Sequence, residues 1–433
     1  MIARTQTTRL LFGLPGAFFV FLAAVGISDL GDAFRAISLD LWFYTDSDNK
    51  EATRLLLVLA GVLPGLLFGP LAGAVADRFS LRRTFLITLI IRGLLSGVLA
   101  AIAATTPPGQ FAYIVVISSA IASVFFASSA FVFVPRMVEK ALLPRANGIA
   151  ESATWALAAV GPATASIAFA FWGPAPSFLI DAATFLIAAG IFAALIRPDA
   201  ASTPRGSVTS NLRSTYREFG ELLRGIPGAV RHLSRNRLAL GMLLASYGVT
   251  FTAGVNSFSL IFLIDVELGL PVEALGFVFS WNGVIAVIAA LSVGFLVRNA
   301  NMKRLFLGCL GVLAASQFLM GLAPNVLFLA IGVAVSAFAN APYNVAVATL
   351  FQTTIDDEYL GRVEGLDTTV ENSLQVAIFL GAAGVVAAVG PRPAMIGAGF
   401  IALALLVGGA FLMGRRQPRV AEAESPVSEP TAQ

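Results

Sequence analysis

Long apolar runs separated by short polar turns dominate the pattern of residues along the chain. Twelve of these runs have the length of about 20 apolar residues that a membrane-spanning helix needs. They lie near residues 14–44, 54–76, 84–104, 111–134, 147–171, 176–196, 238–263, 274–297, 305–322, 326–351, 363–389 and 394–414. Hydrophobic residues make up 57% of the 433 residues and charged residues only 12%, which excludes a soluble globular protein. We therefore predict an all-α membrane protein with twelve transmembrane helices.

A polar break after the sixth run divides the chain into two halves. The motif RANGI at 145–149 and the motif RVEGL at 362–366 each open the fifth run of their half, which indicates a duplicated six-helix unit. Such a duplication places a transport site at the midplane between the halves. The predicted domains are a six-helix bundle at 1–197, a cytoplasmic linker at 198–237, a second bundle at 238–414 and a disordered tail at 415–433.

The linker carries leucine and aromatic residues at helical spacing among several arginines. This pattern predicts either an amphipathic helix on the cytoplasmic surface of the membrane or a plain solvated helix.

Basic residues gather in alternate loops. Of the 28 lysines and arginines, 23 lie in the loops and tails on one side of the predicted spans, whereas only Lys50, Arg54 and Arg392 lie on the other side. Positively charged loops stay in the cytoplasm. We therefore expect a multi-pass protein of the plasma (inner) membrane with both termini in the cytoplasm. This topology also explains the net charge of +3 without any nucleic-acid partner.

Sequence signatures of several other functions are missing. The chain has no glycine-rich loop for ATP, no nucleophile elbow and no pair of histidines, so we expect neither an enzyme nor a bound metal or cofactor. The single cysteine, Cys309, excludes an internal disulfide. We expect a monomer whose partners are the lipid bilayer, a small-molecule substrate and protons.

The turn between the second and third spans carries a recognisable motif. It reads GAVADRFSLRR, and its defining residues are Gly73, Asp77, Arg78, Arg82 and Arg83. These residues resemble the loop 2–3 signature of the major facilitator superfamily, although Ser80 stands where that family has a glycine and Leu81 where it usually has a base. The resemblance implies the fold of that family, with two six-helix halves around a central site.

The same resemblance implies a conformational gate at this turn. In the family, the acid and the bases of the loop dock against the cytoplasmic end of the eleventh span. Carried over to this chain, Asp77 would accept hydrogen bonds from the amino end of that span, and Arg78 and Arg82 would reach Glu364.

Further stretches are similar to the macrolide-efflux and enterobactin-exporter branch of the superfamily, and together they cover nearly the whole chain. They are GISDLGDAF, ADRFSLRR, LLPRANGIAES, SFLIDAATF and YLGRVEGL. Gly161 and Pro162 also resemble the first half of the antiporter motif G-P-x-x-G-G, with Ala165 and Ser166 in place of its last two glycines.

This resemblance implies proton-coupled export of a hydrophobic or amphipathic small molecule, such as a drug, an antibiotic or a siderophore, by alternating access. The alternatives are an uptake carrier, a uniporter or a lipid flippase of the same fold, and a membrane sensor that transports nothing.

Charged side chains inside the predicted spans are candidates for proton coupling, because an ionised group in the bilayer costs about 2.5 to 3.5 kcal/mol. The candidate set is Asp29, Asp32, Arg35, Arg92, Glu151 and Glu371. Asp32 and Arg35 can pair along one helix, which leaves Asp29 without a base on the facing turns of its own helix. We predict that Asp29 carries the proton. A buried ion-pair network that holds the first span to its neighbours is the alternative.

The whole set of intramembrane charges is unbalanced toward acids. Seven carboxyl groups lie in the spans against two arginines, which favours a proton or a cationic cargo. We expect two of the seven, Asp181 and Asp367, to be hydrated near the membrane surfaces.

Neutral polar residues mark the spans of the second half. Those predicted to bind substrate are Asn256, Trp281, Asn282, Asn340 and Asn344. An aromatic ring beside several amides suits a large amphipathic ligand held by stacking and a few hydrogen bonds. Hydrogen bonding between helices is the other role that such amides commonly have.

The topology can be tested with reporter fusions. A reporter fused after Arg416 should be active on the cytoplasmic side, and one inserted at Thr105–Gly109 should lie outside, because 23 basic residues lie on one side of the spans. Opposite locations for both reporters would contradict the orientation.

Overall fold

The computed structural model describes residues 14–78, 80–139, 142–195, 236–297, 300–355 and 357–414. Within these ranges, twelve helices are long and apolar enough to cross a membrane. Those of the first half are α1 (Gly16–Thr45), α2 (Lys50–Arg78), α3 (Leu81–Ala103), α4 (Gln110–Met137), α5 (Leu143–Trp172) and α6 (Pro174–Leu195). Those of the second half are α8 (Arg237–Phe262), α9 (Ala274–Val297), α10 (Met302–Gly321), α11 (Val326–Thr354), α12 (Asp357–Val389) and α13 (Pro391–Gly414).

The predicted all-α membrane architecture is confirmed. A short π-helical turn, η3 (Leu263–Glu267), extends α8. The predicted linker helix and the predicted disordered tail lie outside the described residues.

Several helix starts follow from local capping chemistry. The first amide groups of a helix lack partners within the helix, and asparagine or serine side chains just before the helix can accept their hydrogen bonds. Asn325 accepts from the amides of Leu327 and Phe328 at the start of α11 (3.1 and 3.2 Å). Asn236 caps α8 and Asn301 caps α10 in the same way.

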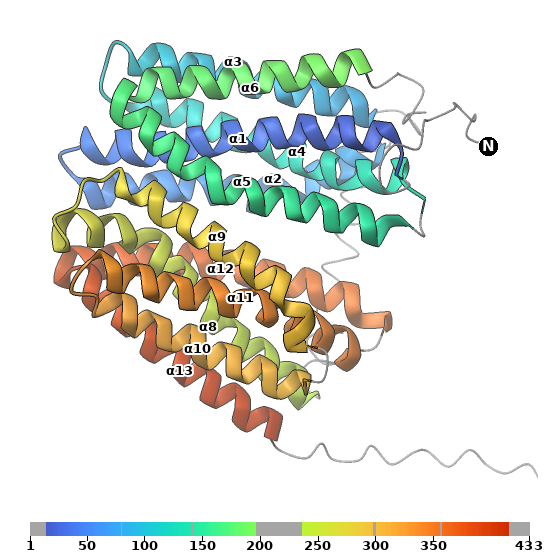
Figure 1. Cartoon of the computed structure of the whole chain (residues 1–433), viewed down its shortest axis with the longest axis vertical. Helices are drawn as coiled ribbons and strands as arrows, with labels where there is room; N and C mark the ends of the chain where they lie inside the picture. The colour runs from blue at the N-terminus through green and yellow to red at the C-terminus, as the bar shows by residue number, and fades with distance from the viewer. Residues whose placement is uncertain are drawn as a thin grey trace, which may run out of the picture.

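The helices form two bundles, α1–α6 and α8–α13, which lie one above the other in Figure 1. We call the end of the bundles where α1 begins and α13 ends the termini face, and the opposite end, with the α1–α2 turn, the hairpin face. The two bundles lie close together at the hairpin face and diverge toward the termini face (Figure 1).

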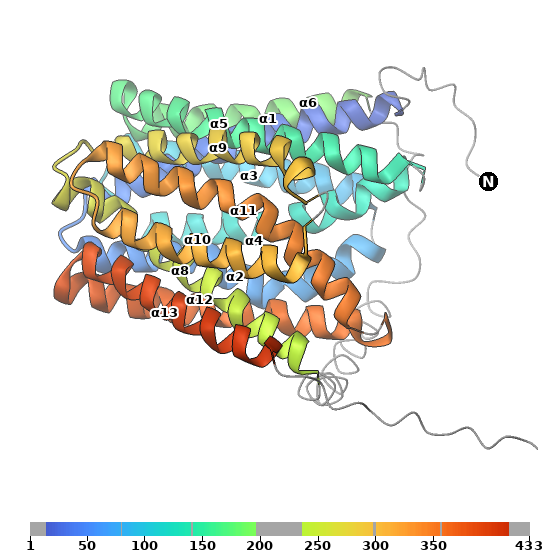
Figure 2. The ribbon, with the colours of Figure 1, turned by 60° about the horizontal axis from the view of Figure 1, so that its bottom comes forward.

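Contact between the bundles runs along α5 with α9 and along α2 with α12, and α5 and α9 lie side by side in Figures 1 and 2. The α5–α9 crossing is unusually close. A Cβ atom added at Gly283 of α9 would lie 2.6 Å from backbone atoms of Ala158 and Ala159 of α5. The amide of Ala163 also donates a hydrogen bond across this contact to Oγ of Ser280, at 2.8 Å.

Charged and aromatic residues close the hairpin face. Asp265 accepts hydrogen bonds from the hydroxyl of Tyr44 (2.8 Å) and from Nζ of Lys50 (3.1 Å), so it joins the second half to both α1 and the start of α2. Arg54 of α2 forms an ion pair with Asp40 and donates to the carbonyl of Ser257, at 2.7 Å.

The position of Arg54 corrects the sequence-based assignment. We expected this arginine in a loop outside the spans, but α2 begins four residues earlier, at Lys50, and the arginine is only 4% exposed. The structure therefore adds a third base to the two arginines expected within the spans, and this base neutralises Asp40.

Helix packing inside the second half can be tested at two adjacent glycines. A Cβ atom at Gly409 would lie 2.7 Å from Cβ of Ala245 on α8, whereas one at Gly408 would lie 3.5 Å from its nearest neighbour. Gly409→Ala should therefore lower stability by about 1 to 3 kcal/mol through overpacking. Gly408→Ala is the matched control and should be neutral or slightly stabilising, because alanine favours the helix equally at both sites. The readout is the midpoint of thermal unfolding in detergent, and equal midpoints would contradict the close α8–α13 contact.

Candidate functional site

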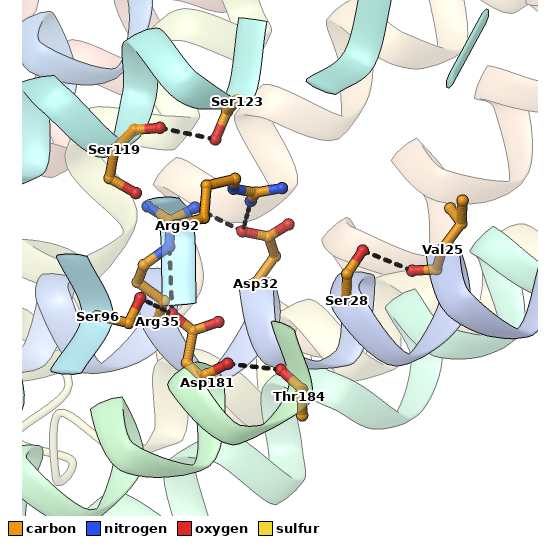
Figure 3. A network of polar contacts seen from close by, with 10 residues as sticks. All are labelled: Val25, Ser28, Asp32, Arg35, Arg92, Ser96, Ser119, Ser123, Asp181 and Thr184. Carbon is orange, nitrogen blue, oxygen red and sulfur yellow. Dashed lines mark hydrogen bonds and ion pairs between the residues drawn. The ribbon is translucent and has the colours of Figure 1, made fainter. Parts of the chain in front are cut away.

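A cluster of charged residues lies inside the first half, among α1, α3 and α6 (Figure 3). Asp32 of α1 accepts from Nη2 of Arg35 at 2.5 Å and also pairs with Nη2 of Arg92 of α3. Nε of Arg35 lies 3.5 Å from Oδ2 of Asp181 on α6. Ser96 donates to the same oxygen at 2.5 Å. We call Asp32, Arg35, Arg92 and Asp181 the charge cluster.

Aromatic rings enclose one of these bases. The guanidinium carbon of Arg92 lies 4.2 Å from the ring centre of Phe185 and 5.0 Å from that of Phe126, and the residue is 2% exposed. The negative face of an aromatic ring attracts a cation, most strongly where water is excluded. The rings therefore help to stabilise a positive charge at a depth in the bilayer where an unpaired arginine is energetically unfavourable.

The charge cluster contains two acids and two bases, so its formal charges balance. The predicted pairing of Asp32 with Arg35 is confirmed, and Arg92 joins it. The expectation that Asp181 is hydrated was wrong, because its side chain is 0% exposed. It shares one stripe of α6 with buried residues such as Ser177 and Phe185, so helical periodicity could have revealed its burial.

Asp29 stands apart from these pairs. It lies near the middle of the 30-residue helix α1, one turn before Asp32, and is partly exposed. It makes no ion pair or hydrogen bond with any residue in the described part of the chain. The structure thus leaves one partly buried carboxyl group beside a balanced cluster.

Two other predicted features of the first half lie on α5. Glu151 is exposed and accepts a hydrogen bond from Nε1 of Trp155 at 2.9 Å. Gly161 is buried and Pro162 lies inside the helix, just before Ala163 with its hydrogen bond to α9. The antiporter-like motif therefore lies at the contact between the two halves, and its role in antiport stays a prediction.

The predicted conformational gate is only partly visible. The surroundings of Gly73 and of the side chains of Asp77, Arg78 and Glu364 lie outside the described set. Arg83 is exposed, and Arg82 donates to the carbonyl of Ala193 on α6, at 3.0 Å. The gate contact with Glu364 stays a prediction.

Two adjoining cavities lie in the second half. The larger, which we call the acidic cavity, has a volume of about 530 Å³ and lies among α8, α11 and α12 toward the termini face. Its polar lining residues are Ser246, Thr250, Tyr343, Asn344, Asp367, Glu371, Asn372 and Gln375. The smaller, which we call the amide cavity, has a volume of about 150 Å³ and is lined by Asn256 and Asn282. Ala253 lines both cavities.

These cavities separate the predicted substrate-binding residues. Asn256 and Asn282 line the amide cavity, and Asn344 lines the acidic cavity. Trp281 and Asn340 line neither: Trp281 donates to the carbonyl of Ala330 at 2.9 Å, and Asn340 accepts from Asn344 at 2.8 Å. Trp281 therefore links α9 to α11, and Asn340 links two successive turns of α11. Hydrogen bonding of this kind is the alternative role that the sequence left open for polar residues in the spans.

The acidic cavity also brings together residues that the sequence pattern did not single out, notably Thr250 and Ser246 on α8. Asp367 lines the same cavity and accepts a hydrogen bond from Tyr247 at 2.9 Å. Glu371, one turn further along α12, accepts a longer one from Thr250, at 3.4 Å. Serine and threonine are common on apolar helices. The sequence alone therefore does not show whether such a residue lines a cavity or packs against another helix.

The importance of the charge cluster for folding can be tested by removing one charge. Asp32→Asn removes the carboxylate charge that pairs with both Arg35 and Arg92. Breaking a buried ion pair from one side costs about 3 to 5 kcal/mol, so yield and thermal stability should fall. Asp29→Asn removes an unpaired carboxyl from the same helix and should leave the unfolding midpoint close to that of the wild type. Equal midpoints for the two variants would contradict the cluster.

Comparison with known proteins places the fold. The transporter structure described as "a POT family transporter in complex with 5-aminolevulinic acid" is similar at a TM-score of 0.73 and 13% identity, covering 92% of this chain and 96% of that one. A mutant form of a peptide transporter POT in complex with alafosfalin gives 0.72 and 15%, covering 94% and 95%. A bacterial metal transporter gives 0.62 and 14%, covering 93% and 100%.

At such identities these likenesses concern the fold alone. No curated protein matches the chain, and the matches above do not support the narrower resemblance to the macrolide-efflux and enterobactin-exporter branch. The family model of the major facilitator superfamily, however, matches residues 10–377, which is most of the sequence. The chain belongs to the major facilitator superfamily.

Proposed function

We propose that this secondary transporter couples proton movement to the export of a hydrophobic or amphipathic small molecule. Its family and the twelve candidate spans among its described residues make it a multi-pass membrane transporter. What we add to this is the coupling ion, a proton; the direction of transport, export; and the type of cargo, a hydrophobic or amphipathic molecule.

The arrangement of the two halves supports alternating access. Asp265 and Arg54 tie the halves together at the hairpin face, whereas the acidic cavity lies toward the termini face, where the bundles diverge (Figure 1). The distribution of lysines and arginines supports a cytoplasmic position for the termini face. With this orientation, the structure corresponds to an inward-facing state.

The observation that carries proton coupling is the carboxyl of Asp29 near the middle of α1, which has no ion-pair or hydrogen-bond partner among the described residues. Burial disfavours the charged form of a carboxyl group and nearby bases favour it, so a change in surroundings can make the group bind or release a proton. Asp32 and Arg92 are the charged neighbours that act on it. A rearrangement that opens one face and closes the other changes these surroundings, and the proton then moves with the conformational cycle.

Glu151 and Glu371 are the other carboxyl groups predicted for this role. Each already accepts a hydrogen bond, from Trp155 and Thr250 respectively. Glu151 is exposed, and Glu371 lies in the second half, away from the charge cluster. Both positions support Asp29 as the first choice.

Proton coupling can be tested in proteoliposomes with a pH dye inside and ethidium as the cargo probe. Asp29→Asn mimics the protonated form permanently, so ethidium should still exchange down its own gradient, while uptake driven by a pH gradient and cargo-induced proton movement should fall at least tenfold. Asp48→Asn, in the exposed α1–α2 turn, is the matched control and should behave like the wild type.

Undiminished proton movement with Asp29→Asn would remove this residue from the mechanism. Loss with Glu151→Gln alone would transfer the role to that glutamate. Loss with Glu371→Gln alone would do the same only if that variant still binds ethidium, because Glu371 lines the acidic cavity. Transport direction follows from comparing everted and right-side-out vesicles, and accumulation by everted vesicles alone is the result expected for export.

A further inference from the structure

We propose that Asp181 is a second proton-binding residue, and that it shares a single proton with Asp29 during the transport cycle. This inference rests on the proton coupling proposed above and adds a residue to it. Asp181 is not among the coupling candidates of the sequence, because a hydrated position was expected for it. In the structure, its side chain is fully buried inside the charge cluster, where it faces groups of α1 and α3 (Figure 3).

The two carboxyl oxygens of Asp181 have different surroundings. Oδ2 accepts a hydrogen bond from the hydroxyl of Ser96 at 2.5 Å, whereas Oδ1 has no hydrogen-bond partner in the described part of the chain. The backbone of α1 closes over Oδ1, since a Cβ atom added at Gly31 would lie 2.7 Å from it. A buried carboxylate with one oxygen unsatisfied is energetically unfavourable. A protonated carboxyl group loses the charge and keeps the bond from Ser96, which donates equally well to a carbonyl oxygen.

The ion pair between Asp181 and Arg35 is not closed by a hydrogen bond. Nε of Arg35 lies 3.5 Å from Oδ2 of Asp181, beyond the usual range of about 2.7 to 3.2 Å for an N–H···O bond. This nitrogen has no hydrogen-bond partner among the described residues. The same guanidinium instead donates to Asp32 at 2.5 Å, and Arg92 pairs with Asp32 as well. This is the geometry expected when Asp32 is ionised and Asp181 carries a proton.

The count of charges indicates one proton. Within the charge cluster two acids face two bases, and Asp29, one turn before Asp32, adds a third carboxyl group. A single proton makes this group of five side chains neutral. Asp29 is partly exposed, whereas Asp181 is 0% exposed, so a negative charge is less unfavourable on Asp29. In this conformation, the proton therefore lies on Asp181.

The two acids are linked through the same charged neighbours. Those that face Asp181 among the described residues are Arg35 and Asp32 of α1 and Arg92 of α3. Asp32 and Arg92 also act on Asp29. When Asp29 binds a proton, its carboxylate becomes a carboxylic acid, and Asp181 releases its own proton and becomes a carboxylate. The new charge on Asp181 attracts the guanidinium of Arg35, which changes the contact between α1 and α6.

The test is the infrared spectrum of the full-length protein in proteoliposomes at neutral pH, without cargo. The region measured is the carbonyl stretch of protonated carboxylic acids, taken as the difference between the wild type and each variant. The wild type should show this band, and Asp181→Asn should lack it. Ser96→Ala keeps the carboxyl group but removes its hydrogen-bond donor, so the band should remain and move to higher wavenumber.

Two further variants test the link between the acids. Asp29→Asn leaves two acids against two bases, which balance without a proton, so the band should disappear there too. Asp48→Asn removes an acid from the exposed α1–α2 turn and should give the spectrum of the wild type. If Asp181→Asn does not purify as a monodisperse protein, the wild type, Ser96→Ala and Asp29→Asn still decide the question.

Three results would overturn the inference. They are a wild-type spectrum without the band, a band that persists in Asp181→Asn, and a band that Ser96→Ala or Asp29→Asn leaves unchanged.

The outcome is separate from that of the proton-coupling assay, because the spectra need neither cargo nor a gradient. In that assay, Asp181→Asn should lower ethidium-induced proton movement at least tenfold. The predicted band without any ethidium-induced proton movement in the wild type would leave the shared proton standing and remove proton coupling. Proton movement that Asp29→Asn abolishes and Asp181→Asn leaves intact would keep the proposed function and overturn this inference.

Discussion

The first half of this transporter depends on the pairing of charges inside an apolar bundle. Each member of the charge cluster would be expensive at bilayer depth by itself, and each is held by an opposite charge, a hydroxyl group or an aromatic ring. The partners come from α1, α3 and α6, so the cluster also fixes how these three helices stand against one another. Asp29 differs from them, because its charged neighbours Asp32 and Arg92 pair with each other and Asp29 has no partner in the described part of the chain.

The two halves solve the problem of buried charge differently. In the first half the charge cluster contains both signs, whereas in the second half no arginine, lysine or histidine is among the described residues that line the acidic cavity. Contacts at the hairpin face, made by Asp265 and Arg54, join the two halves there.

The fold was largely predictable, because spanning helices leave a strong signal of length and hydropathy. The pair formed by Asp32 and Arg35 was also predictable, since both lie on one helix at a fixed spacing. The partners of Asp181 and Arg54 were not, because they depend on which helices become neighbours and on where α2 begins. Trp281 shows the same limit: its sequence context is that of a ligand-stacking ring, but a carbonyl on α11 takes its only polar side-chain atom.

The close crossing of α5 and α9 at Gly283 limits how the two halves can move relative to each other. Backbones that touch cannot approach further, so relative motion there is a rotation about the contact or a slide along it. Gly283 lies about 14 Å from the start of α9 and about 21 Å from its end, at 1.5 Å per residue. A rigid turn about this point would therefore sweep the termini face through an arc about half as long again as that of the hairpin face. A small loosening of the seal at Asp265 would accompany a larger displacement at the opposite mouth.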